Sequence, residues 1–178
     1  GPDLKDPNSL HQPAPTLKGW DKLNMRGLRL GIFWPWFRHA SDEVVSACEA
    51  MLKEFEKMGA SLQEVSIPDM EAARVAHSVT ILSEMFQSMS ATYAEHHQEH
   101  GLDVRTNLAL AGALSSSDYV QAQRVRTRLI AGFNAAMQDV DMILTPSTGL
   151  VAPSIPKDAL PDGNSDLTTV IEIMRFAT

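Results

Sequence analysis

The sequence predicts an α/β fold, in which a mixed β-sheet is flanked by helices. Three short apolar runs at residues 28–34, 62–67 and 140–145 have the length and residue types of buried strands, and helical segments separate them. A chain of 178 residues that is 44% hydrophobic and 21% charged can bury one core of ordinary size. We therefore expect at least three strands of one sheet.

The first elements follow from local signals. Residues 1–27 begin rich in proline and polar residues, which indicates an extended connector, and residues 28–178 are expected to form the α/β segment. Strand 28–34 comes first. Ser41 is then a suitable helix cap, and Asp42 and Glu43 oppose the dipole of the first turn.

The helix that begins at Ser41 has an apolar face and a clear end. Gly59 is predicted to be its C-terminal cap, because glycine tolerates the left-handed conformation found there. The apolar face is expected to comprise Val44, Val45, Cys48, Met51, Leu52, Phe55 and Met58.

Strand 62–67 follows and stops at Pro68, so the strand–helix–strand unit predicts a right-handed parallel crossover. Asp69 is expected to cap a long helix that runs to about His97. A shorter helix is expected over 104–114, and Ser115 or Ser116 should begin another that covers 118–137.

The C-terminal part starts with strand 140–145, which Pro146 ends. A long loop rich in proline and glycine, 147–165, is uncommon inside a compact domain and suggests a role in function or packing. A last helix begins near Asp166 and is expected to continue to the end of the sequence.

Six segments carry a resemblance to a known family. They are GPDLKDP (1–7), LRLGIFWPWF (28–37), IPDMEAARVAHSVTILSE (67–84), GLDVRTNLALAGALSSSDYVQAQRVRTRLI (101–130), VDMILTPSTGLVAP (140–153) and IEIMRFAT (171–178). In these segments and in their order, the chain resembles amidase-signature hydrolases, in the branch of fatty acid amide hydrolases and bacterial or fungal amidases. The resemblance implies part of the amidase-signature fold, hydrolysis of carboxamide C–N bonds by a serine nucleophile, and no cofactor.

The family's catalytic Ser–cis-Ser–Lys triad lies upstream of this region, in a Gly/Ser-rich signature that nothing in this chain matches. The resemblance therefore implies a segment that is incomplete at both ends and holds no catalytic residue. Ser147 does not offer a substitute, because Thr145 replaces the first glycine of a G-x-S-x-G turn and no lysine falls where burial would make it a base.

The segment is instead expected to supply scaffold and one wall of the acyl pocket. Ligands of α/β sheets bind beyond the ends of the strands. A methionine-rich apolar stripe adapts to irregular ligands, although ordinary core packing is the favoured explanation of such a stripe. The substrate contacts predicted from family position and apolar character are Thr145, Ser147, Ile171, Met174, Phe176, Met85 and Phe86.

Other polar and aromatic groups have structural interpretations. His96 and His100 are four residues apart and would share a helix face, but two histidines without a third ligand do not make a zinc site, so we expect no metal. His77 is expected to be buried and hydrogen-bonded. Two more groups are expected to have packing or pairing roles: the aromatic residues Trp20, Trp34, Trp36 and Phe37, and the arginines Arg124 and Arg128, which could otherwise clamp a carboxylate.

Composition limits the partners. A net charge of −7 argues against nucleic acid, and no apolar run approaches the length of a membrane span. A single cysteine, Cys48, and the lack of a secretory signal favour the cytoplasm. The expected partners are a small-molecule amide and the remaining part of the same amidase, and a homo-oligomer is left open. The alternatives are a non-catalytic binding module and a subunit that assembles with a separate chain carrying the triad.

Overall fold

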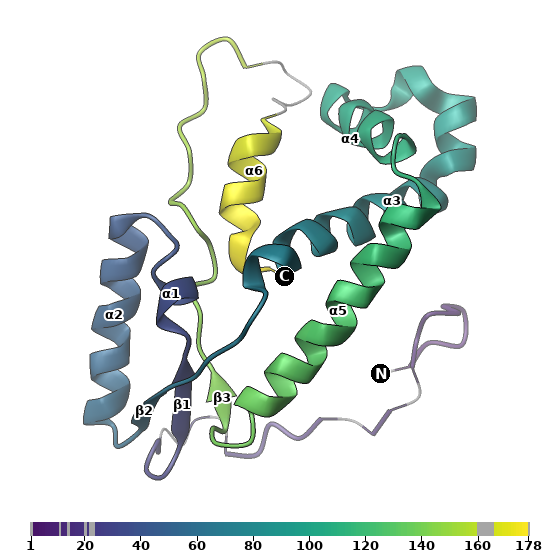
Figure 1. Cartoon of the computed structure of the whole chain (residues 1–178). Coiled ribbons are helices and arrows are strands. Elements are labelled where there is room, and N and C mark those ends of the chain that lie inside the picture. Colours follow the sequence, from purple (N-terminus) through teal and green to yellow (C-terminus); the bar gives the residue numbers. More distant parts are fainter. Residues whose placement is uncertain are drawn as a thin grey trace.

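The computed structural model describes residues 2–10, 12–13, 15–19, 21, 24–159 and 166–177 (Figure 1). Strand β1 (Arg29–Ile32) lies between β2 (Ser61–Glu64) and β3 (Met142–Ile143), and both pairings are parallel. The α/β class and the parallel crossover are confirmed, and the strands described here are all parallel rather than mixed. In the described residues before Arg29 there are turns but no helix or strand, and Trp20 lies outside the described residues.

The central strand is buried because helices cover both faces of the sheet. Leu30 and Ile32 are 1% and 0% exposed. A Cβ atom at Gly31 would lie 2.9 Å from Val140 and 3.0 Å from Val65, so the glycine lets these two side chains close against the strand. On the opposite face, Ile32 belongs to a second apolar cluster that includes residues of the following helix.

A short helix that the sequence did not indicate, α1 (Trp34–Phe37), follows β1 directly. Pro35 suits its first turn, and the turn places Trp36 in the cluster on one face of the sheet and Phe37 in the cluster on the other. The expectation that these aromatic residues serve packing is confirmed.

Helix α2 (Asp42–Lys57) begins after Ser41 as predicted, although the Ser41 side chain makes no cap hydrogen bond. Its buried face centres on Leu52, and Met51 is 52% exposed, so the prediction that Met51 belongs to this face is wrong. Gly59 has φ 101° and donates its N–H to the Glu56 carbonyl oxygen at 2.9 Å, which confirms it as the C-terminal cap.

Helices α3 (Met70–His96), α4 (Leu102–Gly112) and α5 (Ser116–Ala136) match the predicted helices within a few residues, and α3 packs along α5 (Figure 1). Ser115 and Asp118 form a complete capping box at the start of α5. Asp69 does not cap α3. Its backbone is left-handed, with φ 64°, and its carboxylate accepts a hydrogen bond from Arg128 Nε at 3.4 Å.

The third strand is shorter and more exposed than predicted. Only Met142 and Ile143 form β3, and the one described neighbour of this edge strand is β1. Residues 144–159 contain no helix or strand. Helix α6 (Leu167–Ile173) begins after Asp166, whose carboxylate accepts the Thr169 N–H at 3.0 Å. It ends at Ile173 in a 3-10 turn, η2 (Met174–Phe176), so the prediction that it continues to the end of the chain is wrong.

Candidate functional site

The carboxyl ends of the three parallel strands meet at one edge of the sheet, where ligands bind in open α/β folds. Phe33 follows β1, Ile67 follows β2 and Thr145 follows β3. These residues line a hollow of about 160 Å³ at that edge, with Trp36, Met70, Phe133, Ile143 and Phe176. The hollow therefore brings together Thr145 and Phe176, two of the predicted substrate contacts.

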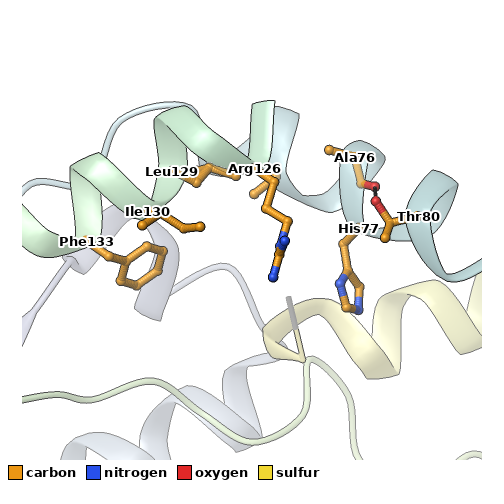
Figure 2. A pocket seen from close by; sticks show the side chains of 8 residues that line it. Ala76, His77, Thr80, Arg126, Leu129, Ile130 and Phe133 are labelled. Atoms are coloured by element: carbon orange, nitrogen blue, oxygen red, sulfur yellow. Dashed lines mark hydrogen bonds between the residues drawn. The ribbon is translucent and has the colours of Figure 1, made fainter. Parts of the chain in front are cut away.

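A second hollow of about 240 Å³ lies between α3 and α5 (Figure 2). It shares Phe133 with the first hollow, so the two adjoin. Its other lining residues are Ala73, Ala76, His77, Thr80, Arg126, Leu129 and Ile130.

A third hollow of about 140 Å³ lies between α3, α4 and α6, and it shares His77 with the second. Ile171 and Met174, two more predicted contacts, line it, and they are 45% and 46% exposed. We call the surface formed by these three hollows the concave face. It is largely apolar. Arg126 and His77 line its middle hollow, and Arg74 and Arg175 line the third.

A charged cluster holds α6 and η2 in place beside the concave face. Arg175 is only 6% exposed and contacts both His39, after α1, and Glu172. Arg74 of α3 reaches Glu172 at 3.5 Å and Glu71 at 3.9 Å, and Glu71 lies 3.2 Å from His39 Nδ1. The cluster thus joins three segments that are far apart in the sequence.

The protonation of this cluster follows from burial and from charge. Desolvation, and then the positive charge of Arg74, lower the pKa of Arg175. Desolvation and the Arg175 charge lower the pKa of His39, although Glu71 acts in the opposite direction. Arg175 and Glu71 compete for Nδ1 of His39, and the lowered pKa favours a neutral imidazole that accepts the Arg175 N–H at 2.6 Å. The pattern Glu-x-x-Arg occurs twice in the cluster, at Glu71 and Arg74 and at Glu172 and Arg175, and it is the sequence signal for these local pairs.

The loop after β3 fixes α6 against the sheet edge. Gly149 donates its N–H to the Ile173 carbonyl oxygen at 3.1 Å, and the Gly149 oxygen accepts the Ser41 N–H at 2.8 Å. Pro146 is fully buried. Ser147 is exposed and lines none of the three hollows.

Two other predicted contacts also lie away from the concave face. Phe86 lines a separate hollow of about 600 Å³ between α3 and the α4–α5 region, where the Tyr119 hydroxyl donates to Glu84 at 3.0 Å. Met85 is half-buried and lines neither this hollow nor the concave face. The fold therefore gathers Thr145, Phe176, Ile171 and Met174 on one surface and separates them from Met85, Phe86 and Ser147.

The histidines differ from expectation. Helix α3 ends at His96, and the chain turns through the 3-10 helix η1 (His97–Glu99), so the prediction that His96 and His100 share a helix face is wrong. His96 pairs with Glu99 at 2.9 Å, and His97 and His100 pack on the ring of Tyr93. His77 is only half-buried and faces the concave face, so its predicted place in the core is also wrong.

Among the described residues, no group of three or more His, Cys, Asp and Glu side chains is arranged to hold a metal ion. None of the helices in this part of the chain combines the length and apolarity needed to cross a bilayer.

Comparison with known proteins places the chain in a family. The Amidase family matches residues 1–178. The chain is 38% identical over 167 residues to the fatty acid amide hydrolase of Oryza sativa subsp. indica, a match that covers 92% of this chain and 28% of that protein. It is 29% identical over 181 residues to an amidase of Pseudomonas putida, a match that covers 100% of this chain and 39% of that protein.

Among solved structures, a bacterial aryl acylamidase of the amidase signature family has a TM-score of 0.70 and 18% identity, covering 99% of this chain and 39% of that one. The chain spans only 28% of the rice protein. The family match over its whole length shows that this protein belongs to the amidase family.

Proposed function

We propose that this protein is the substrate-wall segment of an amide hydrolase. The enzyme would cleave carboxamide C–N bonds with a serine nucleophile whose Ser–Ser–Lys triad lies outside these residues. The observation that carries the proposal is the family match over residues 1–178, together with an apolar concave face at the carboxyl ends of the strands. The 38% identity to a fatty acid amide hydrolase supports an acyl amide as the substrate.

In such a reaction the serine oxygen attacks the amide carbon, and the bridging serine and the lysine relay the proton to the leaving amine. Backbone N–H groups stabilise the charge on the carbonyl oxygen, and water then releases the acid. The residues described here would act by binding. Ile171 and Met174 are large apolar side chains that stay about half exposed, and an acyl chain laid on them would remove that surface from water.

Position matters as much as apolarity for such a wall. Thr145 and Phe176 lie at the sheet edge, and Ile171 of α6 and Met174 of η2 line the third hollow. Helix α6 is held by the buried Arg175 cluster and by the Gly149 hydrogen bonds, so its apolar side chains keep a fixed position relative to the strands. A wall of this kind would align a long acyl group and contribute little for a short one.

The test is an assay of the complete protein that contains these residues, with dodecanamide and acetamide as substrates and ammonia release as the readout. We expect a higher kcat/KM for dodecanamide and serine labelling by a fluorophosphonate probe. The 178-residue chain alone should show neither. Turnover by this chain that is lost in Ser147→Ala would refute the assignment of the nucleophile. Amide binding without turnover by the complete protein would indicate a non-catalytic binding module.

A matched pair of variants tests the wall itself. Ile171→Asp should raise KM for dodecanamide and leave kcat/KM for acetamide unchanged, because it places a charge on the surface proposed for the acyl chain. Val151→Asp is the control, since Val151 is 55% exposed, similar to the 45% of Ile171, and lines none of the three hollows of the concave face. Equal effects of the two substitutions would rule out the wall at α6.

A further inference from the structure

The hollow between α3 and α5 is built from two helix faces with the same spacing. Each helix contributes four residues at positions i, i+3, i+4 and i+7, which is one face of an α-helix. Helix α5 contributes Arg126, Leu129, Ile130 and Phe133, and α3 contributes Ala73, Ala76, His77 and Thr80.

Two polar side chains on these faces point into the hollow. The guanidinium of Arg126 and the imidazole of His77 extend in the same direction from neighbouring helices (Figure 2). Thr80 is not available to a ligand, because its hydroxyl donates to the Ala76 carbonyl oxygen at 2.8 Å and accepts from Gln123 Nε2 at 3.0 Å. The polar groups that remain for a ligand are thus Arg126 and His77.

The ion pairing of Arg126 differs from that of three other arginines in this region. Arg128 pairs with Asp69, and Arg74 and Arg175 both pair with Glu172. Among the residues that the structure describes, no carboxylate forms an ion pair with Arg126. Arg126 is exposed where it borders the mainly apolar hollow, so its guanidinium is accessible. An accessible arginine without a carboxylate partner is suited to bind an anion, because its planar donors match a carboxylate.

We infer that Arg126 and His77 form a carboxylate-binding subsite, with the apolar part of the ligand on Leu129, Ile130 and Phe133. The volume of about 240 Å³ is below the roughly 300–1,000 Å³ of a pocket for a whole drug-sized ligand, so the subsite would take one end of a molecule.

This inference rests on the proposed function, which supplies two sources of the carboxylate. Hydrolysis breaks the C–N bond, and the water oxygen becomes part of a carboxylic acid that ionises while the amine takes a proton. The anion is therefore either this product acid or a carboxylate already present on the amine side of the substrate.

The first experiment measures equilibrium binding to the complete amidase with dodecanoate and with dodecan-1-ol, its neutral counterpart. Arg126→Leu and Arg126→Gln should weaken dodecanoate binding about tenfold or more and leave dodecan-1-ol binding within about twofold. Arg124→Leu is the control, because Arg124 carries the same charge on α5 and does not line the hollow. Unchanged dodecanoate binding, or equal weakening of both ligands, would overturn the inference. Arg126→Gln serves as the second variant in case Arg126→Leu does not fold.

The second experiment compares hydrolysis of N-dodecanoylglycine and N-dodecanoylethanolamine, which differ in the carboxylate on the amine side. A selective fall of kcat/KM for the glycine conjugate in Arg126→Leu supports the subsite and identifies its ligand as the carboxylate on the amine side of the substrate. If dodecanoate inhibits Arg126→Leu more weakly and the ratio of the two kcat/KM values is unchanged, the result supports the subsite and identifies its ligand as the product acid. If the wild type hydrolyses neither amide, the proposed function fails, and the binding experiment still decides the inference.

Discussion

Replacing Gly149 by alanine should destabilise the protein through a contact with the backbone of α6. A Cβ atom at this position would lie 2.2 Å from the Glu172 carbonyl oxygen and 3.4 Å from the Arg175 Cβ atom. The obstacle is backbone, so no side-chain rotation relieves it. Either the loop or the end of α6 must move.

The magnitude follows from what that movement breaks. Overpacking of a well-packed site typically costs about 1–3 kcal/mol. Gly149 also makes two backbone hydrogen bonds, to Ile173 at 3.1 Å and from Ser41 at 2.8 Å, each worth about 0.5–1.5 kcal/mol. If both are lost, the free energy of unfolding falls by about 2–6 kcal/mol, a large part of the roughly 5–15 kcal/mol that stabilises a typical domain.

Urea unfolding followed by tryptophan fluorescence would measure the effect, because Trp36 is buried and its ring lies 5.7 Å from that of Phe176 in η2. The control is Gly132→Ala in α5, whose Cβ would lie 3.3 Å from Pro68 Cδ. The better helix propensity of alanine offsets that contact, so the control should stay within about 1 kcal/mol of wild type. A Gly149→Ala variant as stable as Gly132→Ala would show that the loop does not clamp α6.

The remaining predictions concern a helix cap, a titrating group and metal. Ser115→Ala should lower the free energy of unfolding by about 1 kcal/mol, because the capping box with Asp118 is lost, and Ser117→Ala should not; urea unfolding measures both. The lowered pKa of His39 means that the unfolded state binds more protons. Stability should therefore fall as pH drops below 6.5, the ordinary pKa of histidine. His39→Gln should flatten this fall when the unfolding temperature is measured between about pH 5 and pH 8. An unchanged pH profile in this variant would contradict the role assigned to His39. Dialysis against EDTA should leave the unfolding temperature unchanged, because the described residues offer no three-ligand site; a fall in calorimetry would contradict this.

Features that depend on neighbours in sequence could be predicted from the sequence alone. The cap at Gly59 needs only the left-handed preference of glycine, and the capping box at Ser115 closes within four residues. The helices expected to run to about His97 and over 118–137 match α3 and α5 within a few residues, and the strand–helix–strand order indicated the parallel pairing of β1 and β2. Thr145, Ile171, Met174 and Phe176, which line the concave face, were predicted from their position in the family and their apolar character.

Features that depend on distant residues needed the tertiary structure. Asp69 has a side chain suited to capping α3, but a residue 59 positions away, Arg128, takes its carboxylate. The extent of β3 is set by its pairing with β1, which includes only Met142 and Ile143, and its longer apolar run does not predict this. His77 faces the hollow between α3 and α5 instead of the core, and this depends on how the two helices pack.

The subsite of Arg126 and His77 shows the same division most directly. Periodicity predicts which residues share a face of one helix, since that requires only the local geometry of the backbone. It does not predict which two helix faces meet, or that Arg126 and His77 border the same hollow, because these outcomes depend on how α3 and α5 pack together. The elements and the family resemblance could therefore be recognised from the order of residues along the chain, whereas the polar groups that face a ligand depend on the packing of α3, α5 and α6.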